Sequence, residues 1–184
     1  KCAHFVMSAC MALLEWLSAA PDAAWQQHAP PAWTVVAAIA ALALLLAPRG
    51  LPARWLGVAG LVPLFTVAPG ALRAGDVELV VLDVGHGVSA LVRTERHALL
   101  YDTGPRFGPG ADSGSRIIVP YLRAVGVRRL DGLVVSHDDD DHWGGADSVL
   151  QALPVEWLLT SLPDLDPLVV RAEPALRCES GQSW

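Results

Sequence analysis

The sequence predicts an α/β domain that follows membrane-crossing helices, and three observations support this prediction. Residues 1–70 carry three basic and two acidic side chains, whereas residues 71–184 carry ten and seventeen. In the second part, apolar runs typical of strands are interrupted by helix-like segments, as in α/β folds. Two histidines and four aspartates fill positions 137–142, directly after one of these runs. The chain therefore divides into an apolar part with net charge +1 and an acidic part with net charge −7.

Two long apolar runs in residues 1–70 predict membrane helices. Ala29–Pro48 is 20 residues without a charge, about the length that crosses a bilayer as a helix. Trp55–Gly70 is a second uncharged run, shorter and interrupted by Pro63. A buried core helix is the alternative for the first run, but such a helix normally keeps a polar face and this one has none. Residues 1–20 are interpreted as the end of an earlier helix.

The charges between the two runs predict their orientation. Residues 48–54 include Arg49 and Arg54 and no acidic residue, so by the positive-inside rule this connection faces the cytoplasm. Residues 21–31 would then form an outer loop. We expect a multi-pass protein of the cytoplasmic membrane, with residues 71–184 on its outer side, periplasmic or extracellular.

The strands and helices of the second part are predicted from apolar runs and the turn residues between them. Two runs flank the turn Asp83-Val84-Gly85-His86-Gly87 and predict an antiparallel hairpin. A Gly/Pro/Ser-rich loop is expected over 106–115. The order strand, helix, strand at the end indicates an α/β unit. The expected strands are 77–83, 88–93, 98–102, 130–136 and 155–160, and the expected helices are 117–125, weakened at its start by Pro120, and 144–152.

The acidic cluster lies in the predicted loop between a buried strand and a helix, where α/β folds usually carry their chemistry. Runs of aspartate are most often solvated loops, and a calcium loop is a second alternative. Four adjacent carboxylates repel one another, however, and a bound cation relieves that repulsion. Flanking histidines have no role in an all-oxygen calcium site. Mixed imidazole and carboxylate ligands instead suit zinc, manganese or iron.

Several motifs resemble one family. His137-x-Asp139-x-Asp141-His142-x-Gly144-Gly145 is similar to the metal-binding signature of metallo-β-lactamase-fold hydrolases, with Asp139 in place of the middle histidine. Leu82–Gly87 and Leu99–Pro105 resemble the motifs LDVGxG and LLYDTG of the ComEC family. Pro120-Tyr121-Leu122 and the segment 47–57 are also similar to that family, which brings DNA into bacteria during competence. The resemblance covers essentially the whole chain.

The resemblance implies an αββα sandwich, incomplete in this chain, with a site for two divalent metal ions. His137 and Asp139 would bind the first metal, and Asp141 and His142 the second. Asp102 would sit beside the metals, and Asp83 would lie under the site. Asp141, Asp102 and Asp83 are the three candidate catalytic carboxylates. The expected metals are zinc or manganese, with magnesium as a further candidate, because Asp139 hardens the first site.

Two features depart from the family pattern. His86 stands where the family usually has glutamine, and we interpret it as a turn residue rather than a DNA contact. The later metal ligands of the family would lie beyond Trp184, so residues 71–184 alone are expected to bind metal weakly and to be inactive.

The resemblance therefore predicts part of a DNA-uptake (natural transformation) channel. Its outward domain would be a metal-dependent nuclease that cuts the strand that is not imported. Single-stranded DNA, the membrane and other competence proteins would be its partners. The alternatives are a membrane-anchored hydrolase with another substrate, and a non-catalytic relic that binds DNA.

Overall fold

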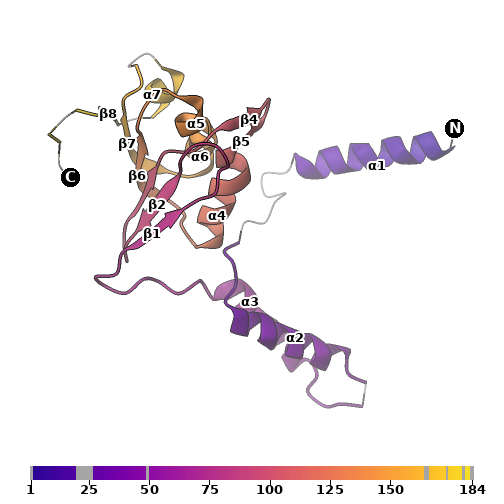
Figure 1. The fold of residues 1–184 in the computed structure, drawn as a ribbon. Helices are drawn as coiled ribbons and strands as arrows, with labels where there is room; N and C mark the ends of the chain where they lie inside the picture. The colour runs from indigo at the N-terminus through magenta and orange to yellow at the C-terminus, as the bar shows by residue number, and fades with distance from the viewer. Residues whose placement is uncertain are drawn as a thin grey trace.

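The computed structural model describes residues 2–19, 27–48, 50–163, 166–172, 174–179 and 181–182. Three helices come first, and a six-stranded sheet with its covering helices follows (Figure 1). The division into two parts at residue 70 stays a prediction. The three leading helices are α1 (Cys2–Ser18), α2 (Ala32–Leu46) and α3 (Leu56–Thr66).

Helices α2 and α3 form a hairpin of small and apolar residues. A side chain on Gly57 would meet the Ala41 carbonyl oxygen at 2.6 Å, and one on Gly60 would meet the Ala41 side chain at 2.8 Å, so glycine permits this close packing. Outward-facing side chains of the hairpin are apolar and exposed, among them Trp33 and Ile39.

The helices are shorter than the apolar runs that contain them. Helix α2 has 15 residues, and α3 has 11 with Pro63 inside. Within the part of the chain that the structure describes, no helix combines the length and hydropathy needed to cross a membrane. The predicted membrane helices are therefore not confirmed.

The sheet joins an antiparallel and a parallel half. Its strand order is β1-β2-β3-β6-β7-β8, and the strands β1, β2 and β3 pair antiparallel, whereas β3, β6, β7 and β8 pair parallel. The predicted first hairpin and the predicted strands are confirmed to within two residues at most ends. The strands are β1 (Glu78–Val81), β2 (Ala90–Arg93), β3 (Ala98–Tyr101), β6 (Leu130–Val135), β7 (Val155–Thr160) and β8 (Ala175–Arg177).

Helices cover one face of this sheet. Leu91, Leu100, Leu133 and Leu158 follow one another across four strands, and none is more than 1% exposed. They pack with apolar residues of the covering helices in one core. These helices are η1 (Gly114–Ile118), which is a π-helix, α4 (Val119–Ala124) and α6 (Ala146–Ala152).

The opposite face of the sheet is much more open at β1 and β3. Leu79 is 65% exposed, Val81 71% and Tyr101 41%. On this face the ring of Trp157 occupies the space that a side chain on Gly132 would need. The described residues thus form one helical layer and one sheet of the four layers implied by the resemblance.

Some predicted elements were wrong. Part of the loop expected over 106–115 is a small hairpin, β4 (Arg106–Gly108) with β5 (Ala111–Asp112). The predicted helix 117–125 is preceded by the π-helical turn η1, and Pro120 is accommodated at the start of α4, where no backbone donor is needed. Three further elements were not predicted: the short helices α5 (Asp140–Trp143) and α7 (Pro167–Arg171), and the last strand of the sheet, β8.

Candidate metal centre

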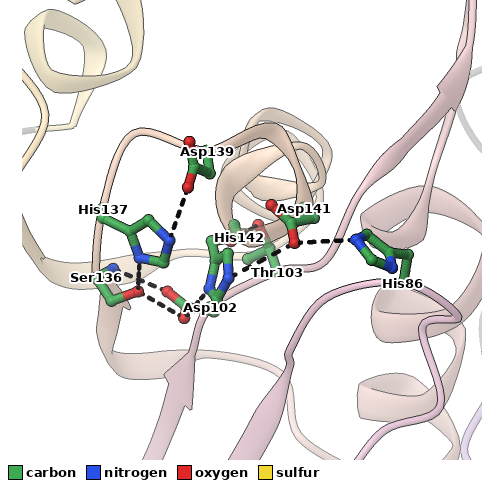
Figure 2. A network of polar contacts seen from close by, with 8 residues as sticks. All are labelled: His86, Asp102, Thr103, Ser136, His137, Asp139, Asp141 and His142. Carbon is green, nitrogen blue, oxygen red and sulfur yellow. Dashed lines mark hydrogen bonds and ion pairs between the residues drawn. The ribbon is translucent and has the colours of Figure 1, made fainter.

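The acidic cluster lies at the carboxyl ends of two neighbouring parallel strands, β3 and β6. Asp102 directly follows β3, and Ser136 and His137 directly follow β6. The second half of the cluster is not a loop, as predicted, but the short helix α5, which places Asp141 and His142 above the strand ends. Figure 2 shows these side chains converging, together with His86 from the β1–β2 turn.

Asp102 is the buried centre of the site. Its side chain accepts hydrogen bonds from the Ser136 backbone N–H at 2.8 Å, the Ser136 hydroxyl at 2.7 Å and His142 Nδ1 at 2.8 Å. The residue is fully buried and has a φ of +53°, a left-handed conformation that aspartate tolerates better than most residues. Its own N–H donates to the Val134 carbonyl, which ties β3 to β6 at this point. Asp102 therefore fixes the strand ends and the histidine in one arrangement.

Both imidazole rings take their orientation from this one carboxylate. His142 Nδ1 contacts Asp102 directly, and His137 Nδ1 lies 2.8 Å from the Ser136 hydroxyl, which itself donates to Asp102. If both Nδ1 atoms carry the proton, this network is satisfied throughout, and both Nε2 lone pairs point away from it (Figure 2). Metal-binding histidines in proteins are commonly held in this way.

Each Nε2 faces a carboxylate of the cluster. His137 Nε2 lies 3.2 Å from Asp139 Oδ2, and His142 Nε2 lies 3.8 Å from Asp141 Oδ2. Two facing lone pairs repel unless a proton or a metal ion lies between them. The donor set therefore fits divalent metals, as two pairs of one imidazole and one carboxylate each.

The pairs alone do not complete a metal site. Among the described residues, no three His, Cys, Asp or Glu side chains are gathered so that they could hold a metal ion together. A zinc site normally needs at least three protein ligands. Any metal held here would need further ligands in addition to each pair.

His86 lies closer to the site than its interpretation as a turn residue suggested. Its Nε2 is 3.7 Å from Asp141 Oδ2, and its side chain is 91% exposed. The turn is docked against α5, because Val88 N–H donates to the Asp141 carbonyl at 3.4 Å and Gly87, with a φ of +102°, lies directly against that carbonyl. His86 and Asp141 are far apart in the sequence, so only the fold brings them together. The DVGHG turn was the one sequence signal that pointed to His86.

Three other aspartates lie outside the network. Asp83 is exposed, and its side chain accepts from the Gly85 N–H at 3.2 Å, so it stabilises the turn rather than contacting the cluster. Asp140 accepts from the Arg106 N–H at 3.1 Å and thereby holds the β4 segment against α5. Asp138 makes no polar contact with any residue that the structure describes.

The backbone around the cluster is tightly packed. The His142 carbonyl accepts from the Thr103 N–H at 2.7 Å, which joins α5 to the segment after β3. A side chain on Gly145 would lie 2.5 Å from the Thr103 carbonyl oxygen and 2.5 Å from the Gly114 nitrogen. The absence of a side chain at position 145 is therefore what lets three segments meet under the site.

Comparisons with known proteins match the part of the chain that carries this site. The family model of the metallo-beta-lactamase superfamily matches residues 82–174, which include the whole cluster. Competence protein ComA of Neisseria gonorrhoeae is 45% identical over 121 residues, which are 66% of this chain and 17% of that protein. Recombination protein 2 of Haemophilus influenzae is 42% identical over 79 residues, which are 43% of this chain and 10% of that protein.

A relative from Bacillus subtilis is also similar. ComE operon protein 3 of Bacillus subtilis is 29% identical over 108 residues, which are 52% of this chain and 14% of that protein. The chain thus spans less than a fifth of the length of each of these relatives.

Proposed function

Because the chain belongs to the metallo-beta-lactamase superfamily and, within it, to the ComEC family of competence proteins, we propose that it is part of a DNA-uptake channel. In this proposal residues 71–184 contribute to a metal-dependent nuclease domain that cuts the strand that is not imported. The observation that carries the proposal is the orientation of both imidazoles by the single buried carboxylate of Asp102. A solvated acidic loop would have no need of that arrangement.

Four residues of the cluster would bind two metals, and Asp102 would orient the two imidazoles. His137 with Asp139 would hold one divalent metal, and His142 with Asp141 the other. With a proton on each Nδ1, His142 would donate to Asp102 and His137 to the Ser136 hydroxyl, and both Nε2 atoms would be free to bind metal. Bound metals would supply charge neutralisation at the phosphodiester and a water of lowered pKa.

The choice of metal follows from the ligand types. One imidazole and one carboxylate in each pair suit zinc or manganese, and magnesium is the weaker candidate because it prefers oxygen ligands. His86 lies on the exposed side of Asp141, where an incoming phosphodiester would pass.

The nuclease proposal is tested with the full gene product that contains this chain. We expect it to cleave labelled single-stranded DNA when manganese or zinc is supplied. His137→Ala and Asp141→Asn should each reduce cleavage to the level of the metal-free protein, because each removes one ligand of a two-ligand pair.

Asp138→Asn is the matched control, because Asp138 belongs to the same acidic run but makes no polar contact with the described residues. It should cleave DNA like the wild type. Equal cleavage by the wild type and by both ligand variants would exclude the cluster as the catalytic site.

We also propose that the α2–α3 hairpin lies in the cytoplasmic membrane and that residues 71–184 lie on its outer side. The exposed apolar side chains of the hairpin and the arginines of its connection support this placement. Such a position would put the cluster where incoming DNA first arrives.

Cysteine labelling in spheroplasts tests the placement, with the three native cysteines replaced by serine. Glu156→Cys, at an exposed position of β7, should react with a membrane-impermeant maleimide. Gly50→Cys, where a side chain meets open space at the hairpin connection, should react only after the membrane is permeabilised. The reverse pattern would overturn the proposed orientation.

A further inference from the structure

A second polar site lies at the other end of the sheet from the metal centre. A pocket of about 270 Å³ opens between three segments that are distant in the sequence. They are residues 68–72 after α3, residues 93–98 at the β2–β3 turn, and residues 125–129 between α4 and β6. Asp131 of β6 also lines the pocket. The metal centre does not use any of these residues.

The pocket concentrates positive charge in an acidic part of the chain. Four of the ten arginines of residues 71–184 line it, against only Glu95 and Asp131. Residues 71–184 as a whole carry a net charge of −7. The fold therefore gathers a local cationic surface that the average composition conceals. The four are Arg93, Arg96, Arg128 and Arg129.

Some of these charges are already paired. Arg93 is half-buried and bound to Glu78 and to the Val125 carbonyl, which fixes the floor of the pocket. Asp131 accepts from the Ala98 N–H at 2.7 Å and lies 3.3 Å from His97 Nδ1 and 3.6 Å from Arg129. Burial alone would raise the pKa of Asp131, but the Ala98 N–H, His97 and Arg129 together hold it below its ordinary value, so it stays ionised.

Other cations of the pocket remain available. Arg128 is exposed and forms no hydrogen bond or ion pair with any residue that the structure describes. Arg129 is 67% exposed, and Arg96 is 80% exposed and only 4.0 Å from Glu95, a weak surface pair. Guanidinium groups in this situation are suited to binding phosphate oxygens.

The apolar hairpin leaves the domain at this same end. Helix α3 ends at Thr66, and the residues that follow it line the pocket. On the other side of the hairpin, Ala29 N–H donates to the Ala124 carbonyl at 2.8 Å, close to the pocket loop 125–129. Figure 1 shows α2 and α3 extending from the end of the domain where α4 stops.

The metal centre lies at the opposite end. Strand β6 begins beside Arg129 and ends beside Ser136, and its six residues span about 17 Å. A nucleic acid strand bound at the cluster would therefore have to cross the length of the sheet to reach the pocket.

We propose that this pocket binds the phosphate of an anionic lipid headgroup where the α2–α3 hairpin enters the bilayer. The inference rests on the membrane placement under the proposed function, but not on nuclease activity. Exposed guanidinium groups beside a membrane anchor can pair with the phosphate of an anionic headgroup in the leaflet that they face. Bound lipid would hold the amino ends of β3 and β6 toward the membrane and the metal centre away from it.

The test measures lipid binding by the full chain in neutral detergent micelles. Native mass spectrometry detects the bound lipid. The probe is short-chain phosphatidylglycerol, and the control lipid is phosphatidylcholine of equal chain length, whose phosphate is balanced by the positive charge of its choline. We expect phosphatidylglycerol to bind and phosphatidylcholine not to bind. Arg128→Gln with Arg129→Gln should weaken phosphatidylglycerol binding by about tenfold or more, because two charge-assisted contacts to the phosphate are lost.

Arg116→Gln is the matched control for the single variants Arg128→Gln and Arg129→Gln, because Arg116 is exposed on η1, outside the pocket, and each of these replacements removes one positive charge. It should bind lipid like the wild type. Equal weakening by Arg116→Gln, or no weakening by the double variant, would overturn the proposal.

Inorganic phosphate and a thymidine oligonucleotide are tested as alternative ligands of the same pocket. Tighter binding of the oligonucleotide than of phosphatidylglycerol through Arg128 and Arg129 would make this a nucleic acid site instead. The cysteine labelling reports separately on membrane placement, and the DNA assay on nuclease activity, so their failures are distinguishable from failure of the lipid site.

Discussion

Replacing Asp102 with alanine is expected to lower the free energy of unfolding by about 3–5 kcal/mol, because three hydrogen-bond donors lose their acceptor at once. The substitution leaves the Ser136 N–H, the Ser136 hydroxyl and His142 Nδ1 without their acceptor. Each unsatisfied buried donor costs about 1–3 kcal/mol. Alanine is also strained at the φ of +53° that Asp102 adopts. Urea unfolding followed by near-ultraviolet circular dichroism, in one detergent for all variants, measures the difference.

Asp102→Asn separates folding from metal binding. Asparagine keeps the size of the side chain and tolerates the left-handed backbone, so it should be less destabilising. It removes the charge that orients both imidazoles, and metal affinity should fall by about 10–100-fold. Asp83→Asn is the control, because Asp83 is exposed and contacts only its own turn. Wild-type metal affinity in Asp102→Asn would show that this carboxylate does not orient the ligands.

Replacing Gly145 with alanine is expected to destabilise the chain by about 3 kcal/mol, at the upper end of the cost of overpacking. Gly145 has a φ of −94°, which any residue adopts, so the cost is steric alone. The new methyl group would lie 2.5 Å from the Thr103 oxygen and the Gly114 nitrogen, and both are backbone atoms that cannot rotate away. Relief would move α6 away from β3 and spread the cluster. The shift of the urea midpoint measures this effect.

Gly70→Ala provides the comparison for Gly145, because a side chain there meets nothing within 4 Å. It should leave the urea midpoint within experimental error. If Gly145→Ala unfolds at the same urea concentration as Gly70→Ala, the contact between α6, η1 and the segment after β3 is looser than these distances imply.

The main strands could be predicted because each is a dense run of Val and Leu bounded by turn residues. This holds for β1, β2, β3, β6 and β7, whose positions follow from local sequence alone. The hairpin of β4 and β5 could not be predicted, because its strands have three and two residues rich in glycine and polar side chains. Such short strands exist through their pairing with each other, which no local pattern records.

The candidate site was predictable only where its residues are neighbours in the sequence. His137, Asp139, Asp141 and His142 form one motif, and the family resemblance of that motif implied their pairing. The contact of Asp102 with His142 depends on the parallel pairing of β3 with β6, and that of His86 with Asp141 depends on the docking of a turn on α5. The cationic pocket depends on three separate segments and was hidden by a negative average charge.

The position of Trp157 makes its fluorescence sensitive to the state of one sheet face. Its indole rests on the bare backbone of Gly132, on the sheet face that is left open at β1 and β3. Tryptophan emission moves to shorter wavelength when water leaves the surroundings of the ring. Because the chain has seven tryptophans, a variant in which the other six are phenylalanine would report, through the emission of Trp157, when that face of the sheet is covered and when it is wet.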